Sequence, residues 1–246
     1  MIRLVPLPVA GRIEPGDDLV ALLLAAVERA GEQLADGDVL VVAQKAVSKV
    51  EGRIVALADV EPSSAAIAIA AEDDGDPRVV EVVLRESIEI VRRRGSFIIG
   101  RTPHGHVCGS AGVDRSNQNA SDHVTLLPED PDDSARRLCA DLAAIAAVAV
   151  VISDSFGRPF RRGTTGVAIG AAGFAPVVEH AGRPDDAGRT LHATRVHVAD
   201  QLASAAELLL GPYGGVPAVL IRGVVLEPGT EGAADGVIPA DRDLFT

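Results

Sequence analysis

A short apolar run followed at once by polar groups is the feature that most constrains this chain. Residues 149–152 are all apolar, and Ser153, Asp154 and Ser155 follow them directly. A run of this kind and length is typical of a buried strand. Asp154 would then stand at the end of that strand, where its carboxylate is held rigidly. Carboxylate and hydroxyl oxygens suit hard cations such as magnesium or manganese, so Asp154 and Ser155 are candidate metal ligands.

Three arginines come next, in a loop bounded by glycines. Arg158, Arg161 and Arg162 lie within residues 156–163. Arginines beside a bound cation suit phosphate groups, which makes these three side chains candidate anion-binding residues. A solvated basic loop is the alternative interpretation. The strand, its acid and the arginine loop together indicate a site for a metal ion and a nucleotide.

Strand-like and helix-like patterns alternate only in part along the chain, which predicts a mixed α+β fold with flanking helices. We expect strands at 2–7, 39–43, 97–99, 106–108, 149–152, 166–172 and 216–221, and helices at 19–30, 62–75, 79–93, 130–147 and 197–210. The 246 residues suffice for one large unit. We expect a single unit over 1–246, with two lobes formed by 1–93 plus 190–246 and by 94–189.

Composition argues against several classes of partner. The formal net charge is −12 and aromatic residues make up only 2% of the chain, so nucleic acid is a poor partner. The longest apolar-rich stretch, 142–152, is shorter than the roughly 20 residues that a membrane helix needs. The first residues do not have the layout of a signal peptide, and the two cysteines form no CxxC pair. We therefore expect a cytoplasmic protein without a membrane partner.

Other candidate residues carry weaker signals. Asp114 lies in a turn-forming loop, and a ligand site and a simple turn are equally good interpretations of it. Lys45 and Lys49 directly follow the apolar run 39–43, where ligand groups are often found, although surface lysines are the alternative. His104 and His106 would share one face of a strand, and such a pair is more often structural than metal-binding. The chain contains no GxxxxGK[ST] sequence, which argues against an ordinary P-loop enzyme.

Taken in order, several of these motifs resemble one family, the coenzyme F420-0:L-glutamate ligases, also called F420 γ-glutamyl ligases. The sequences AGVDRSN at 111–117 and ISDSFGRPFRRG at 152–163 carry much of the resemblance. Further matching stretches are 15–19, 37–42, 47–53, 85–87, 104–108, 126–128, 130–132, 167–170, 198–203 and 221–223. The order is collinear and covers nearly the whole chain, and the set of motifs is more specific than any one of them.

The resemblance implies the fold of this family and an enzyme that uses GTP to add L-glutamate to coenzyme F420-0, forming an amide bond through an acyl phosphate. It implies magnesium or manganese as cofactor, allows a monovalent cation, and implies a homodimer without a fused C-terminal reductase domain. It assigns metal binding to Asp114, Asp154 and Ser155. It assigns nucleotide binding to Ala10, Gly11, Arg12, Ile13, Gln44, Lys45, Lys49, Asn117, Gly214 and Gly215.

The chain departs from the family at one place. Family members often carry an acidic or amide residue just after the glycine that corresponds to Gly211, as a further metal ligand, whereas Pro212 stands here. The resemblance therefore assigns no residue to complete a second metal site. Two alternatives remain at this point: a metal-dependent phosphohydrolase, which Asp114 and Asp154 would serve equally well, and a non-catalytic nucleotide-binding module.

Overall fold

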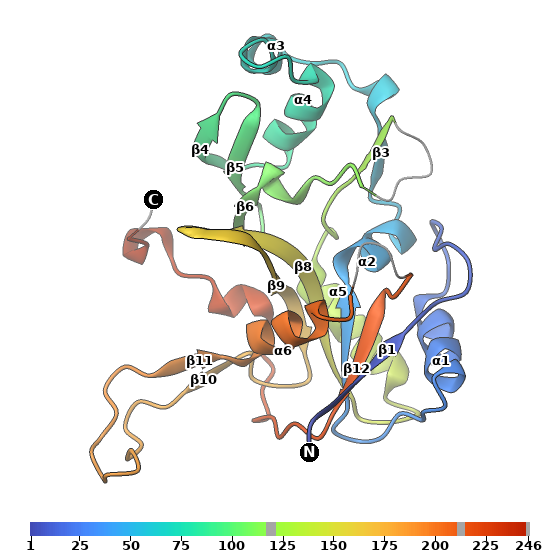
Figure 1. The fold of residues 1–246 in the computed structure, drawn as a ribbon, viewed down its shortest axis with the longest axis vertical. Helices are drawn as coiled ribbons and strands as arrows, with labels where there is room; N and C mark the ends of the chain where they lie inside the picture. The colour runs from blue at the N-terminus through green and yellow to red at the C-terminus, as the bar shows by residue number, and fades with distance from the viewer. Residues whose placement is uncertain (117–121, 211–214, 245–246) are drawn as a thin grey trace.

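The computed structural model is built around a five-stranded mixed sheet (Figure 1). The structure describes residues 1–116, 122–210 and 215–244. The strands are β1 (Arg3–Leu7), β2 (Val39–Ala43), β8 (Ala149–Arg158), β9 (Arg161–Ala172) and β12 (Ala218–Arg222), in the order β1-β12-β2-β8-β9. The central strands β2 and β8 run parallel, while the neighbouring pairs β1–β12, β12–β2 and β8–β9 are antiparallel.

Helices cover both faces of this sheet, and accordingly β2 and the first four residues of β8 are apolar on both faces. Residues of α1 (Leu19–Arg29), α2 (Gln44–Val50) and α5 (Pro131–Leu142) form one core with one face of the sheet. Residues of α6 (Val198–Glu207) form a second core with the other face. Val150 and Ile152 of β8 point into the first core, whereas Ala149 and Val151 point into the second.

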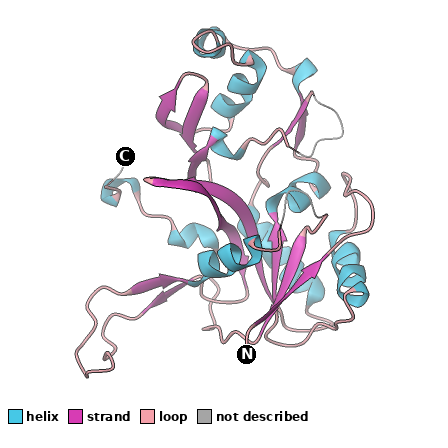
Figure 2. Ribbon diagram, viewed as in Figure 1, coloured by secondary structure: helices cyan, strands magenta, loops and turns pink. Residues whose placement is uncertain are grey.

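Smaller elements surround the central sheet (Figure 2). A three-stranded sheet, β4-β5-β6, lies beside α3 and α4, and two short strand pairs, β3–β7 and β10–β11, complete the β structure. Their bounds are β3 Ile54–Ala56, β4 Glu89–Arg94, β5 Phe97–Arg101, β6 Val107–Gly109, β7 His123–Thr125, β10 Val177–Glu179, β11 Arg195–His197, α3 Ser64–Ala70 and α4 Pro77–Arg85. Short 3-10 helices are η1 Leu57–Asp59, η2 Ser110–Gly112, η3 Ala233–Gly236 and η4 Ala240–Arg242. The predicted α+β class is confirmed.

The helix predicted over 79–93 is wrong in its second half. Helix α4 ends at Arg85, and Glu89–Arg94 form β4, which pairs with β5 in antiparallel register. The helical spacing of Val79, Val80, Val82 and Val83 ends at this point. What makes the following residues a strand is the hydrogen bonding offered by β5, a partner that local periodicity does not reveal.

The arginine loop is also not an open loop. Residues on both sides of the turn pair as a long hairpin, in which β8 extends to Arg158 and β9 begins at Arg161. Phe160 takes a positive φ of 62° at the turn and is 93% exposed. The three arginines therefore lie at the tip of the β8–β9 hairpin.

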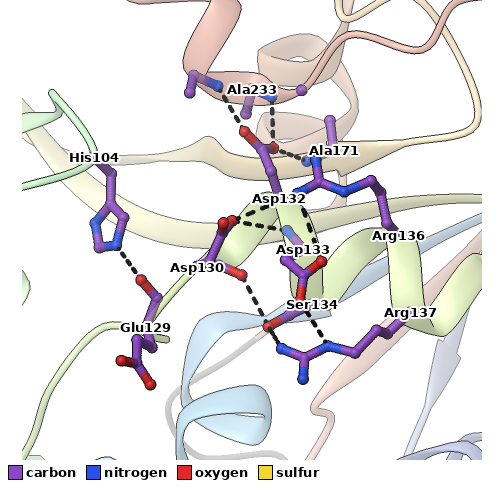
Figure 3. Close-up of polar contacts among 12 residues, drawn as sticks. His104, Glu129, Asp130, Asp132, Asp133, Ser134, Arg136, Arg137, Ala171 and Ala233 are labelled. Atoms are coloured by element: carbon purple, nitrogen blue, oxygen red, sulfur yellow. Dashed lines mark hydrogen bonds and ion pairs between the residues drawn. The ribbon is translucent and has the colours of Figure 1, made fainter.

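One buried acid ties distant parts of the fold together (Figure 3). Asp132, in the first turn of α5, is 8% exposed, and its carboxylate accepts three backbone N–H groups. The donors are Ala171 of β9 at 2.8 Å, and Ala233 and Ala234 of η3 at 2.7 and 3.1 Å. A carboxylate that satisfies three amides in this way fixes the C-terminal segment against the central sheet.

The structure bears on two further expectations, which concern membrane helices and the division into two lobes. No helix within residues 1–116, 122–210 and 215–244 is long and apolar enough to cross a membrane. The division into lobes stays a prediction, and strands from both expected lobes share the central sheet, since β8 and β9 pair beside β1, β2 and β12.

Candidate functional site

A cavity of about 720 Å³ opens where the parallel pairing of β2 with β8 ends. Ala43, the last residue of β2, pairs with Ser153 of β8, and both residues line the cavity. Because the two strands point the same way, the residues that follow β2 meet the part of β8 that continues past Ser153. This is the position at which open α/β sheets generally bind ligands. Asp154 lies within β8, where it pairs with Val167, so its predicted position at the end of a strand is wrong.

Most of the site residues expected from the sequence line this single cavity. They are Gly11, Arg12, Ile13, Gln44, Lys45, Lys49, Asp114, Asp154, Ser155 and Gly215. Ala10, which precedes this set, does not belong to the described part of the cavity wall. The three arginines of the hairpin tip, Arg158, Arg161 and Arg162, do not line it either. Asn117 and Gly214 lie outside the described residues, as does Pro212.

The backbone of Asp114 is fixed by strand β7. Its N–H donates to the carbonyl of Thr125 at 2.9 Å, and the N–H of Thr125 donates back at 2.8 Å. The Asp114 carboxylate receives Lys45 Nζ at 2.6 Å and the backbone N–H of Ser116 at 2.6 Å. Burial works to raise the pKa of Asp114, but these hydrogen bonds outweigh it, so the pKa lies below its ordinary value. Asp114 is therefore a stable anion.

Asp154 has a different electrostatic environment. Burial raises its pKa to about 6, a hydrogen bond from the N–H of Ser155 opposes that rise, and the negative charges of Asp114 and Glu207 add to it. The carboxylate bears the cost of burial without enough positive charge to offset it. A cation placed at this point would remove that cost.

Helix α2 contributes further groups. Gln44 is buried, and its side-chain amide donates to Ser48 Oγ at 2.7 Å and to the carbonyl of Leu126 at 2.9 Å. These bonds give Gln44 a structural role that the sequence does not predict. Lys49 is half-buried, and this burial lowers its pKa despite the favourable charge of Glu14. A desolvated lysine ammonium binds anions strongly.

The donor set suits a hard divalent cation. Asp114, Asp154 and Ser155 offer two carboxylates and a hydroxyl, all of them oxygen ligands. Across the described part of the chain, no three acidic, histidine or cysteine side chains lie close enough to hold a metal by themselves. A magnesium ion typically uses one or two carboxylates and completes its shell with water and substrate phosphates. The two aspartates match that pattern.

Sequence reasoning missed three polar residues of the cavity wall. Glu207 ends helix α6, Ser153 lies just before Asp154, and Thr164 lies on β9. Ser153 directly follows the apolar run 149–152, which is the only sequence signal for these residues. Glu207 reaches the cavity because α6 packs on the sheet. The sequence shows only an acid on an amphipathic helix, which does not indicate that this side chain lines a cavity.

The two histidines have structural partners. His104 Nε2 lies 2.8 Å from the carbonyl of Glu129, and His106 Nε2 lies 3.3 Å from the carbonyl of Ile169. His106 is buried, and burial lowers its pKa. These contacts support the structural interpretation of the pair.

Comparison with known proteins places this geometry in a family. The model of the F420-0:gamma-glutamyl ligase family matches residues 9–223. A coenzyme F420:L-glutamate ligase of Methanothermobacter thermautotrophicus is 47% identical over 85% of this chain and 83% of its own length. A protein of the same name from Methanopyrus kandleri is 43% identical over 99% of this chain and 97% of its own length. The chain therefore belongs to the F420-0:gamma-glutamyl ligase family.

Proposed function

We propose that this protein is a GTP-dependent ligase that joins L-glutamate to coenzyme F420-0 through an amide bond. The relatives named coenzyme F420:L-glutamate ligase support the two substrates and the ligase class. The observation that carries the proposal is the convergence of Asp114 and Asp154, forty residues apart in sequence, on one cavity that also contains Lys45 and Lys49. Two acids and two lysines form a suitable site for a nucleoside triphosphate with its cation.

The reaction requires activation because a carboxylate is a poor acyl donor. The precursor carboxylate attacks the γ-phosphorus of GTP, which breaks the bond to GDP and gives an acyl phosphate. The ammonium group of L-glutamate loses one proton to water, and the resulting amine attacks the carbonyl carbon. The amide bond forms as phosphate leaves with the bonding electrons and takes up the second proton that the nitrogen loses. Lys45 and Lys49 stabilise the charge on the phosphoryl oxygens during the first transfer.

Asp114, Asp154 and Ser155 would hold magnesium or manganese, which neutralises phosphate charge when bound. The Lys45–Asp114 ion pair orients both side chains toward the same region of the cavity. Arg158, Arg161 and Arg162, at the hairpin tip, are proposed to bind the phosphodiester of the precursor or to lie in a homodimer interface. Light scattering of the purified protein tests the dimer.

The decisive test uses GTP, Mg²⁺, L-glutamate and coenzyme F420-0, with each reactant omitted in turn. We expect GDP and the glutamyl product to form in equal amounts, and only when all the reactants are present. GDP formation without glutamate and precursor would instead indicate a phosphohydrolase. Binding of GTP without turnover under either cation would indicate a non-catalytic module.

Replacement of Lys49 by alanine tests the nucleotide site. We expect Lys49→Ala to weaken GTP binding by about 10- to 100-fold, because the variant loses a partly desolvated charge–phosphate contact. Affinity for coenzyme F420-0 should change much less. Calorimetric titration with a non-hydrolysable GTP analogue measures the effect, and an unchanged dissociation constant would show that Lys49 does not contact the nucleotide. Arg94→Ala, at an exposed position of β4 away from the cavity wall, is a suitable control.

A further inference from the structure

The cavity has a second polar wall, which shares Ser155 with the proposed cation site and otherwise consists of residues that have no role there. Strand residues alternate between faces, and Ser153 and Ser155 lie on the α6 side of β8, opposite to Asp154. Ser155 Oγ donates to Glu207 Oε1 at 2.5 Å. Thr164 of β9 pairs with Gly157, two residues beyond Ser155, and also lines the cavity. The wall formed by Ser153, Ser155, Thr164 and Glu207 is called the hydroxyl–carboxylate wall below.

Packing of α6 on β9 holds Glu207 in this position. The Asp200 carboxylate accepts the N–H of Ala168 at 2.9 Å, and Ser204 Oγ donates to the carbonyl of Gly166 at 2.7 Å. A Cβ on Gly166 would lie 2.4 Å from the carbonyl oxygen of Ala203, so the helix and strand are in close contact. Glu207 follows Ser204 by three residues, about one helical turn, and therefore lies on the same helix face.

A buried hydroxyl indicates that this wall receives a ligand. Ser153 is 3% exposed and lines the cavity, and its Oγ has no hydrogen-bond partner among residues 1–116, 122–210 and 215–244. Buried polar groups are nearly always paired, because an unpaired one loses the hydrogen bonds that water would make. A ligand group with hydrogens to donate would satisfy Ser153 and Glu207 together.

We propose that the hydroxyl–carboxylate wall binds the ammonium group of the amino-acid substrate. This inference rests on the proposed function for the identity of that substrate. An ammonium has three donors. Glu207 and Ser153 offer a carboxylate and a hydroxyl oxygen to accept two of them, which leaves the third for water. GTP and the precursor bring phosphates and carboxylates to the cavity, whereas the amino acid brings the one cationic group among the organic reactants.

Reaction geometry requires the same placement. The amine must attack the carbonyl carbon beside the transferred phosphoryl group, so its site must adjoin the cation site. Ser155 connects the two sites, since its N–H donates to Asp154 Oδ1 at 2.8 Å and its hydroxyl donates to Glu207. An amine held at Glu207 would therefore lie next to the activated carboxyl group.

The test compares two ligands that differ in the amine. The protein is loaded with a non-hydrolysable GTP analogue and Mn²⁺, then titrated calorimetrically with L-glutamate or with glutarate, which has both carboxylates and no amine. We expect Glu207→Gln to weaken L-glutamate binding by about 10- to 100-fold, because a charged hydrogen bond is lost. Glutarate affinity should stay within about twofold of the wild-type value. Ser153→Ala should weaken L-glutamate binding in the same selective manner, to a smaller extent.

The control is Glu28→Gln, a carboxylate on the exposed face of α1, which should bind both ligands as the wild type does. Unchanged L-glutamate affinity in Glu207→Gln would overturn the inference, and so would a parallel loss of glutarate affinity. A higher Mn²⁺ requirement with unchanged L-glutamate affinity would assign Glu207 to a second cation instead. Because this titration needs no turnover, selective loss of L-glutamate binding in a protein that makes no product would support the amine site and refute the ligase.

Discussion

Asp154→Asn should reduce ligase turnover by at least about 1,000-fold. Asparagine keeps the shape of the side chain but supplies no negative charge to a cation. The bound cation stabilises the charge of the transition state by several kcal/mol, and each loss of about 1.4 kcal/mol slows the reaction tenfold. Steady-state formation of GDP and glutamyl product under saturating Mg²⁺ measures the loss. A variant with near-normal turnover would show that Asp154 does not hold the metal.

The same substitution should stabilise the metal-free protein at neutral pH. The pKa of Asp154 is about 6 in the folded protein, above the ordinary value of 3.8. Folding stability from this group is therefore present below about pH 4 and is lost as pH rises through 6. Asparagine does not ionise and escapes this loss, which amounts to about 3 kcal/mol at pH 7.5.

Asp114→Asn provides the matched comparison. The pKa of Asp114 lies below its ordinary value, so its charged form stabilises the fold above that value and the contribution is lost in acid. We expect Asp114→Asn to lower the stability of the metal-free protein, the opposite sign to Asp154→Asn, although both variants lose turnover. Chemical denaturation in chelator at pH 7.5 gives both values. A destabilised Asp154→Asn would contradict the proposed electrostatics.

Asp132→Ala should cause the largest loss of stability, about 3 kcal/mol. The substitution removes the acceptor of three backbone N–H groups, and buried donors left without partners are costly. For a chain of this size we expect the melting temperature to fall by about 6–12 °C. Scanning calorimetry measures the change.

Its neighbour Asp133 is the natural control. Asp133 pairs with Arg136 and Arg137 on the exposed side of α5, and such surface pairs contribute about 1 kcal/mol or less. Asp133→Ala should therefore change the melting temperature by only a few degrees. Equal losses in the two variants would show that the triple amide contact of Asp132 does not hold the C-terminal segment.

The central part of the fold could be predicted from the sequence because its signals are local. The apolar runs at 39–43 and 149–152 indicate buried strands by composition alone. Residues that directly follow these two apolar runs line the cavity, and their role in ligand binding stays a prediction.

The remainder depends on partners distant in sequence. Residues 153–158 and 161–166 contain serine, threonine, arginine and glycine without a strand pattern, and they are strands because they pair with each other. Residues Glu89–Arg94 likewise form a strand because they pair with β5. Glu207 reaches the cavity because Ser204 and Asp200 fasten its helix to β9, a contact that no local pattern contains.

The parallel pairing of β2 with β8 has a consequence for how the protein acquires activity. Residues 44–148 lie between these two strands, so pairing β2 with β8 closes a very long loop of the chain. The conformational entropy of that loop must be lost before the contacts between the strands form. Early folding intermediates would contain Lys45 and Lys49 without Asp154 beside them. Competence to bind nucleotide would then emerge late during refolding, and it would report on completion of the whole sheet.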